Sequence, residues 1–174
     1  MSAVWDASHK FHGKYRGKVE DNVDPMQLGR LQVSVPDALG TDTSTWALPC
    51  APLAGAQNGI LALPVKGTQV WVEFEQGDLD YPIWVGCFWG EGELPPLSLQ
   101  TPPGTAAITL QTEKQNGLTI SDVPGPGGGI RIVSAGGASV VVNDQGITID
   151  NGQGATITLQ GPTVSINGNA LEVT

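Results

Sequence analysis

The second half of the chain repeats one short unit, and this repeat limits the possible folds more than any other feature. Each unit holds two aliphatic residues separated by one residue, and successive units begin 7 to 12 residues apart. Gly, Asn, Asp and Gln fill the turns between the units. This alternation predicts short β-strands with one apolar face. The aliphatic pairs are Leu118/Ile120, Ile130/Ile132, Val140/Val142, Ile147/Ile149, Ile157/Leu159, Val164/Ile166 and Leu171/Val173.

Strands of this kind at short, regular intervals are typical of a β-solenoid or β-helix. Each strand offers only a few medium-sized aliphatic side chains, and the second half has no aromatic residue. A unit of about 60 residues buries too little surface to be stable on such side chains alone, and open sheet edges favour aggregation. We therefore expect three chains to wind together, with the aliphatic pairs forming a common core and a trimer interface.

The first half has strand periodicity of a different kind. Residues 13–22, 29–37 and 68–75 alternate apolar and polar side chains, which predicts strands with one buried face. Residues 82–90 are apolar on both faces, which leaves two interpretations: a strand buried entirely in the core, or one that also contacts another subunit. Several short strands separated by Gly, Asn, Asp and Pro turns in about 80 residues favour a small closed barrel such as an OB-fold.

The composition changes sharply between these halves. All five Trp residues come before Glu91, and residues 91–107 are rich in Pro and Gly. We expect an all-β chain with an N-terminal tail (1–12), an OB-fold barrel (13–90), a linker (91–107) and an intertwined trimeric β-helix, or needle (108–174).

Composition also limits the partners and the compartment. The net charge of −9 with only 8 basic residues argues against a nucleic-acid partner, because phosphate binding needs clustered Lys and Arg. The start of the chain lacks a secretory signal pattern, and no apolar run is long enough for a membrane span, so we expect folding in the cytoplasm. Cys50 and Cys87 lie in apolar stretches and are expected to be small buried side chains, with a disulfide as the alternative.

Candidate chemical sites are weak. His9 and His12 have no carboxylate or Cys that would complete a metal site, so we interpret them as part of a polar tail. Glu73 and Glu75 are spaced like a glycosidase pair but fit a solvated strand face better. The Gly-rich segment 125–129 lacks the Lys of a phosphate loop. We expect no catalytic residue, cofactor or metal, and therefore no enzyme.

Four sequence blocks follow one another in the first half: GKVEDNVDP at 17–25, LGRLQVSVP at 28–36, WALPCAPLAG at 46–55 and LPVKGTQVWVEFEQGDLDYPIWVG at 63–86. In this order they resemble the OB domain of spike proteins of the phage baseplate assembly protein V and VgrG type. The aliphatic repeat is consistent with the needle that follows the barrel in these proteins. The resemblance implies a structural spike of a contractile injection machine, such as a phage baseplate, a tailocin or a phage-tail-like particle.

The resemblance also implies partners. Because about 12 residues precede the barrel, it implies a separate hub protein on the N-terminal side. It implies a small tip protein of the PAAR type at the C-terminal end, where Leu171, Val173 and Thr174 would make the contact. The target membrane would be met only during puncture. The alternative is a trimeric fibre that binds glycans or a receptor through exposed aromatic side chains, for which Trp46, Trp71 and Trp84 are the candidates.

Overall fold

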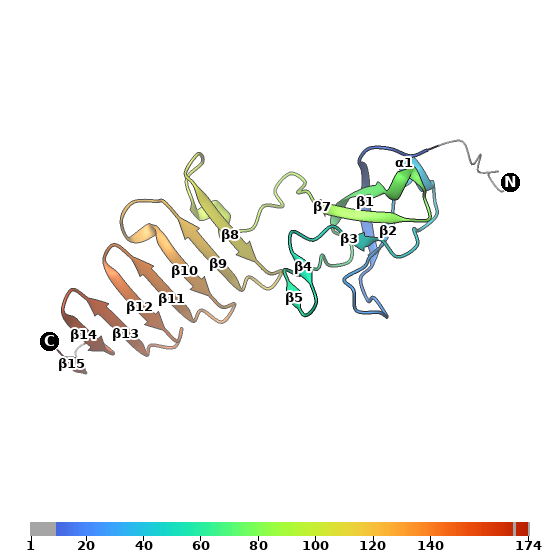
Figure 1. Ribbon diagram of the computed structural model, residues 1–174. Helices are drawn as coiled ribbons and strands as arrows, with labels where there is room; N and C mark the ends of the chain where they lie inside the picture. Colours follow the sequence, from blue (N-terminus) through green and yellow to red (C-terminus); the bar gives the residue numbers. More distant parts are fainter. Residues whose placement is uncertain (1–9, 169, 174) are drawn as a thin grey trace. The chain divides into compact units, whose positions relative to one another are not determined.

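The computed structural model describes residues 10–168 and 170–173, and the chain divides into two units, Met1–Gly90 and Glu91–Thr174. His9 and Thr174 lie outside the described residues. Within the described part, strands dominate both units, as the periodicity predicts, and the α-helix α1 (Pro36–Leu39) is a single turn (Figure 1). No helix in this part is long and apolar enough to cross a membrane.

The first unit is built on a five-stranded sheet in the order β2-β1-β6-β7-β3. Its neighbours are antiparallel except for β3, which runs parallel to β7. The strands are β1 (Tyr15–Asp21), β2 (Gln32–Ser34), β3 (Leu48–Pro49), β6 (Gln69–Phe74) and β7 (Pro82–Cys87). A small separate hairpin pairs β4 (Ala54–Gly55) with β5 (Asn58–Gly59), and the 3-10 turn η1 (Glu75–Gly77) connects β6 to β7.

A pair of backbone hydrogen bonds joins the two edges of this sheet. The Leu31 N–H donates to the Ala47 carbonyl at 3.1 Å, and the Ala47 N–H donates to the Leu31 carbonyl at 2.7 Å. Leu31 directly precedes β2 and Ala47 directly precedes β3, so the contact brings the edge strands together. The sheet thereby closes on itself, which is the barrel that the turn-rich first half predicts.

The interior of the barrel is the core of the first unit. The inward positions of β1, β2 and β6 carry the residues that period-two alternation predicts as buried. On β1, Gly17 has no space for a side chain, because a Cβ atom there would lie 2.9 Å from the Ser34 carbonyl oxygen. The two strands can therefore cross closely at this point. The buried apolar residues are Val19, Leu31, Val33, Val35, Ala38, Ala47, Val70, Val72, Phe74 and Trp84.

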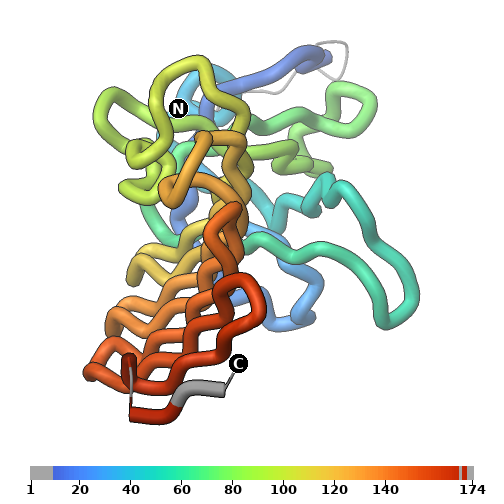
Figure 2. The backbone as a smooth tube through the Cα atoms, turned by 90° about the vertical axis from the view of Figure 1, so that its left-hand side faces the viewer, coloured from blue at the N-terminus to red at the C-terminus, as the bar shows by residue number. Residues whose placement is uncertain are grey.

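The second unit is an eight-stranded antiparallel sheet whose strands follow one another in chain order, from β8 to β15 (Figures 1 and 2). Each strand is joined to the next by a short turn, so the repeat forms an open meander within one chain. The strands are β8 (Ala107–Gln111), β9 (Gly117–Ser121), β10 (Gly129–Val133), β11 (Ser139–Asn143), β12 (Gly146–Asp150), β13 (Thr156–Gln160), β14 (Thr163–Ile166) and β15 (Leu171–Val173).

The segment before this sheet packs against it. The 3-10 turn η2 (Ser98–Gln100) follows Leu97, whose N–H donates to Gln111 Oε1 at 2.9 Å. The Gln100 Oε1 atom accepts a hydrogen bond from Arg131 of β10. Residues expected to act only as a linker thus cover part of the sheet beside its first strands. The other 3-10 turn, η3 (Gly125–Gly127), lies at the Gly-rich connection before β10.

Candidate trimer interface

Cross-strand pairing gathers the aliphatic repeat into two continuous columns on one face of the second sheet. The register pairs Ile130 with both Ile120 and Val142, and it pairs Ile132 with both Leu118 and Val140. The first column is Ile108, Ile120, Ile130, Val142, Ile147, Leu159, Val164 and Val173. The second column is Leu110, Leu118, Ile132, Val140, Ile149, Ile157, Ile166 and Leu171.

The columns contain all fourteen residues that the sequence analysis assigned to the needle core, together with two that it missed. The missed residues are Ile108 and Leu110 of β8, which pair with Ile120 and Leu118. Their segment, Ala107–Gln111, has the same alternation as the other strands, so the signal was present in the sequence. The candidate interface therefore begins at β8, one strand before the first aliphatic pair of the sequence analysis.

Most side chains of these columns are exposed in the part of the chain that the structure describes. Ile108, Leu110 and Ile132 are 59%, 62% and 52% exposed. Among the described residues, every apolar side chain classed as fully buried lies in the first unit, so the second sheet has no core of its own. An apolar face of this length is far larger than the patches that monomers normally expose. Such an exposed apolar face is expected to be buried against a partner along the length of the sheet.

The opposite face of the same sheet is suited to water. In each strand from β8 to β14, the residue between the two column positions points to this face, and most of these residues carry a hydroxyl group. They are Thr109, Thr119, Arg131, Val141, Thr148, Thr158 and Ser165. The sheet is therefore one-sided, and only its aliphatic face needs to be buried.

Side chains in the turns hold the strands in register. The Asn143 Oδ1 atom accepts the Gln145 N–H at 2.9 Å and the Asp150 Oδ1 atom accepts the Gly152 N–H at 2.6 Å, so each closes its own turn. Asn116 and Asn167 accept N–H groups of more distant segments, those of Ala135 and Thr156. Because a slip of one residue would turn every aliphatic side chain to the polar face, these bonds help to keep the columns together.

Family comparisons agree with both halves of this architecture. Residues 15–89 match the type VI secretion system/phage-baseplate injector OB domain. Residues 107–172 match the phage baseplate V C-terminal trimerisation domain, which covers the columns up to the last strand. The chain belongs to the phage baseplate V and VgrG type of spike proteins. This confirms the fold class, with an OB domain followed by a trimerisation domain.

One curated relative of the spike protein is the actin cross-linking toxin VgrG1 of Vibrio cholerae serotype O1 (strain ATCC 39541 / Classical Ogawa 395 / O395). The two are 36% identical over 75 residues, which are 43% of this chain and 7% of the relative. The chain thus matches only a small part of that protein. The shared segment supports the family assignment, but it is no basis for assigning the activity of the relative to this chain.

The family assignment makes this spike protein a structural component of a phage or injection-system particle and supports a homotrimer. Baseplate and spike proteins of this kind are generally not enzymes. Glu73 lies on the barrel surface, where it accepts a hydrogen bond from Lys14 and forms an ion pair with it. Glu75 is the first residue of the turn η1. No group of three or more potential metal ligands occurs among residues 10–168 and 170–173.

The prediction for the cysteines was wrong. Cys50 and Cys87 are both exposed in the chain, and both are free thiols. Cys87 ends β7, where partial desolvation by neighbouring atoms raises the pKa of its thiol. Their apolar sequence neighbours were misleading because adjacent residues of a strand point to opposite faces.

The three Trp residues that were candidates for glycan or receptor binding all make contacts within the OB domain. Trp84 is 8% exposed, and its Nε1–H donates to the Gly29 carbonyl at 3.1 Å. The guanidinium of Arg16 lies 5.0 Å from the Trp71 ring, which also packs against Phe88. Trp46 packs against the guanidinium of Arg30. Among the described residues, these contacts give the fibre alternative no support.

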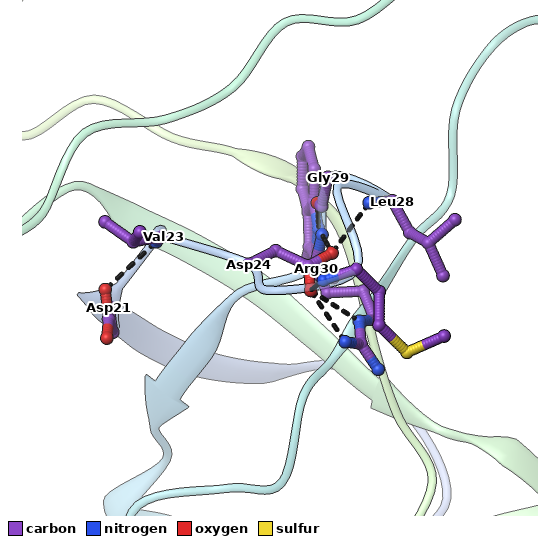
Figure 3. A network of polar contacts seen from close by, with 8 residues as sticks. Asp21, Val23, Asp24, Leu28, Gly29 and Arg30 are labelled. Atoms are coloured by element: carbon purple, nitrogen blue, oxygen red, sulfur yellow. Dashed lines mark hydrogen bonds and ion pairs between the residues drawn. The ribbon is translucent and has the colours of Figure 1, made fainter.

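Asp24 organises the loop between β1 and β2 (Figure 3). Its carboxylate accepts the N–H groups of Met26, Leu28 and Arg30 at 3.0, 2.8 and 3.2 Å. It also pairs with the Arg30 guanidinium, whose Nη2 lies 2.6 Å from Oδ1. The hydrogen bond from Arg30 and those from the backbone lower the pKa of Asp24 well below its usual range, and the Asp24 carboxylate in turn raises the pKa of Arg30.

Asp24→Asn is expected to lower the melting temperature of the OB domain, because an amide cannot accept all of these hydrogen bonds and leaves Arg30 without its counter-ion. Asp21→Asn is the matched control, since Asp21 accepts one backbone N–H, that of Val23. A folded pKa below the unfolded value of about 4 means that the charged Asp24 stabilises the fold above that pH. This contribution is lost as the pH falls from about 4 toward the folded pKa, so the melting curves of wild type and Asp24→Asn should converge there. Curves that stay equally separated at all pH values would contradict this role.

Proposed function

We propose that this protein is the central spike of a contractile injection machine, a phage tail baseplate, tailocin or phage-tail-like particle. The proposal rests mainly on the one-sided sheet, in which two aliphatic columns run over eight strands and most of their side chains are exposed among the described residues. Three copies that face their columns toward a common axis would bury both columns and leave the hydroxyl-rich faces in water. Family membership supports this arrangement through the C-terminal trimerisation domain.

Such a trimer suits mechanical work. If the three chains are intertwined as a β-helical needle, no strand can fray without breaking contacts to strands of its neighbours, so unfolding has a high kinetic barrier. A narrow rod with few free sheet edges resists both force and aggregation. In the proposed function the rod pierces the target envelope when the surrounding sheath contracts.

The ends of the rod would meet other proteins. On the N-terminal side we propose a separate hub protein. At the C-terminal end β15 is the last strand of the meander, and its Leu171 side chain is 54% exposed. We propose that a PAAR-type tip protein covers this end, where Leu171, Val173 and Thr174 are the candidate contacts. Cross-linking mass spectrometry of the assembled particle would identify both neighbours, and an exposed β15 end in the particle would contradict the tip.

The test of the proposed function is the mass in solution. Light scattering on a sizing column is expected to give three times 18.1 kDa, about 54 kDa. The trimer is also expected to run as one species on an SDS gel without boiling and to dissociate when boiled. A folded monomer would mean that the aliphatic columns are covered within one chain, and the spike proposal would fall.

A further inference from the structure

Two loops of the OB domain present a second apolar surface, which the columns of the needle do not explain. Six large aliphatic side chains on these loops are between 43% and 70% exposed. The segment 51–65, which includes the β4-β5 hairpin, contains no charged residue. We call this the apolar loop surface, and it consists of Met26, Leu28, Leu53, Ile60, Leu61 and Leu63.

Two contacts join these loops. A Cβ atom at Gly29 would lie 2.9 Å from Leu61 Cδ1, so the backbone of the first loop and the Leu61 side chain of the second are in close contact. The Asn22 side chain donates to the Pro64 carbonyl at 3.0 Å and ties the second loop to the first. The six exposed aliphatic side chains therefore lie on two loops that are joined to each other.

Both loops are held in shape before any partner arrives. The Asp24 carboxylate accepts the Leu28 N–H directly, and Figure 3 shows the Leu28 side chain pointing away from that carboxylate. In the hairpin, the Ile60 N–H donates to the Leu53 carbonyl at 3.0 Å, which places these two residues next to each other. A surface that is already ordered loses little entropy on binding, so its exposed aliphatic groups are suited to a stable contact.

We infer that the apolar loop surface packs against the OB domain of a neighbouring copy and forms a second interface in the trimer. This inference rests on the trimer of the proposed spike. In this trimer the trimerisation domain would hold three OB domains at a high local concentration, so even a weak contact between copies would be largely formed. The surface is aliphatic and free of charge along 51–65, which is typical of obligate contacts between copies, because such interfaces are more apolar than those of separate partners.

The inference is tested with the full chain by placing a photoreactive residue, p-benzoylphenylalanine, at Leu61. Illumination of the purified trimer followed by boiling in SDS is expected to give covalent dimers and trimers. The control carries the same residue at Tyr81, which is as exposed as Leu61, at 62% against 70%, but lies on the turn between η1 and β7. We expect mainly monomer from this control.

Three outcomes are distinguishable. A trimeric mass with no more cross-linked dimer from position 61 than from position 81 would overturn the second interface and leave the spike proposal standing. Cross-links from position 61 to a different protein in the assembled particle, with none between copies, would also overturn it and make this surface a site for a separate partner. A monomeric mass would overturn the spike proposal itself.

Hydrogen exchange is a second measurement that does not depend on the photoreactive group. Leu61→Ser is expected to speed exchange of the Ile60 amide at least about threefold while the mass stays trimeric, because the hairpin loses its cover from the neighbouring copy. Tyr81→Ser is expected to leave this amide unchanged. Equal exchange in wild type and Leu61→Ser would count against the interface.

Discussion

Ile149→Asp is expected to abolish the trimer. Ile149 lies in the middle of one aliphatic column, between Val140 and Ile157 on the neighbouring strands. Covering an aliphatic side chain contributes about 2 kcal/mol, and this is lost once per chain. A carboxylate enclosed at a dry interface adds a penalty of several kcal/mol each time, and three such charges would meet near one axis. Light scattering should show monomers or aggregates in place of the trimer of about 54 kDa.

The matched control for this variant is one residue away. Thr148 belongs to the same strand, β12, but its side chain points to the hydroxyl-rich face, where it is paired with Val141 and Thr158. Thr148→Asp adds the same charge at nearly the same height along the needle. It is expected to keep the trimer, because its carboxylate stays in water. Loss of the trimer in Thr148→Asp, or its survival in Ile149→Asp, would contradict the assignment of the two faces.

Trp84→Ala is expected to unfold or strongly destabilise the OB domain and to leave the needle assembled. Trp84 is the largest side chain of the barrel core, and its removal leaves a cavity and frees the Gly29 carbonyl. Truncation of a buried aromatic residue typically costs about 3–5 kcal/mol. Thermal unfolding followed by circular dichroism should show the OB transition at a much lower temperature, while light scattering still reports a trimer.

Trp89→Ala provides the control for this variant. Trp89 follows β7 and is 64% exposed, so its loss should change stability by no more than about 0.5 kcal/mol. A simultaneous collapse of both units in Trp84→Ala would show that the needle depends on the barrel. Equal effects of the two substitutions would show that Trp84 is not the centre of the core.

The sequence analysis predicted the strands well where one face was clearly apolar. Alternation identified the buried positions Leu31, Val33 and Val35, which are all fully buried. It was less informative for residues 82–90, which are apolar on both faces. There the structure buries Trp84, partly covers Val85 and ends the strand at Cys87, so that Trp89 is exposed. A local pattern cannot decide such cases, because the covered face depends on which strand lies alongside.

The sequence analysis predicted that Asp residues form turns, but it did not predict the contacts that these residues make. Asp24 lies in such a turn, and the structure adds the ion pair with Arg30 and three backbone hydrogen bonds. Both residues are visible in the sequence six positions apart. Their pairing follows from the path of the loop, in which Gln27 and Gly29 adopt positive φ values and turn the chain back. That path is held by contacts with Leu61 and Trp84, which are distant in the sequence.

From its sequence alone, the protein is an all-β chain of two unlike halves, and its second half cannot bury its aliphatic residues without partners. Both conclusions depend on periodicity and composition, which are local quantities. Only the tertiary structure closed the barrel through the Leu31–Ala47 contact and aligned the pairs into two unbroken columns that include Ile108 and Leu110. It also brought the two apolar loops together. These features depend on backbone hydrogen bonds between segments far apart in the chain, whose register is set by the whole sheet and not by any one strand.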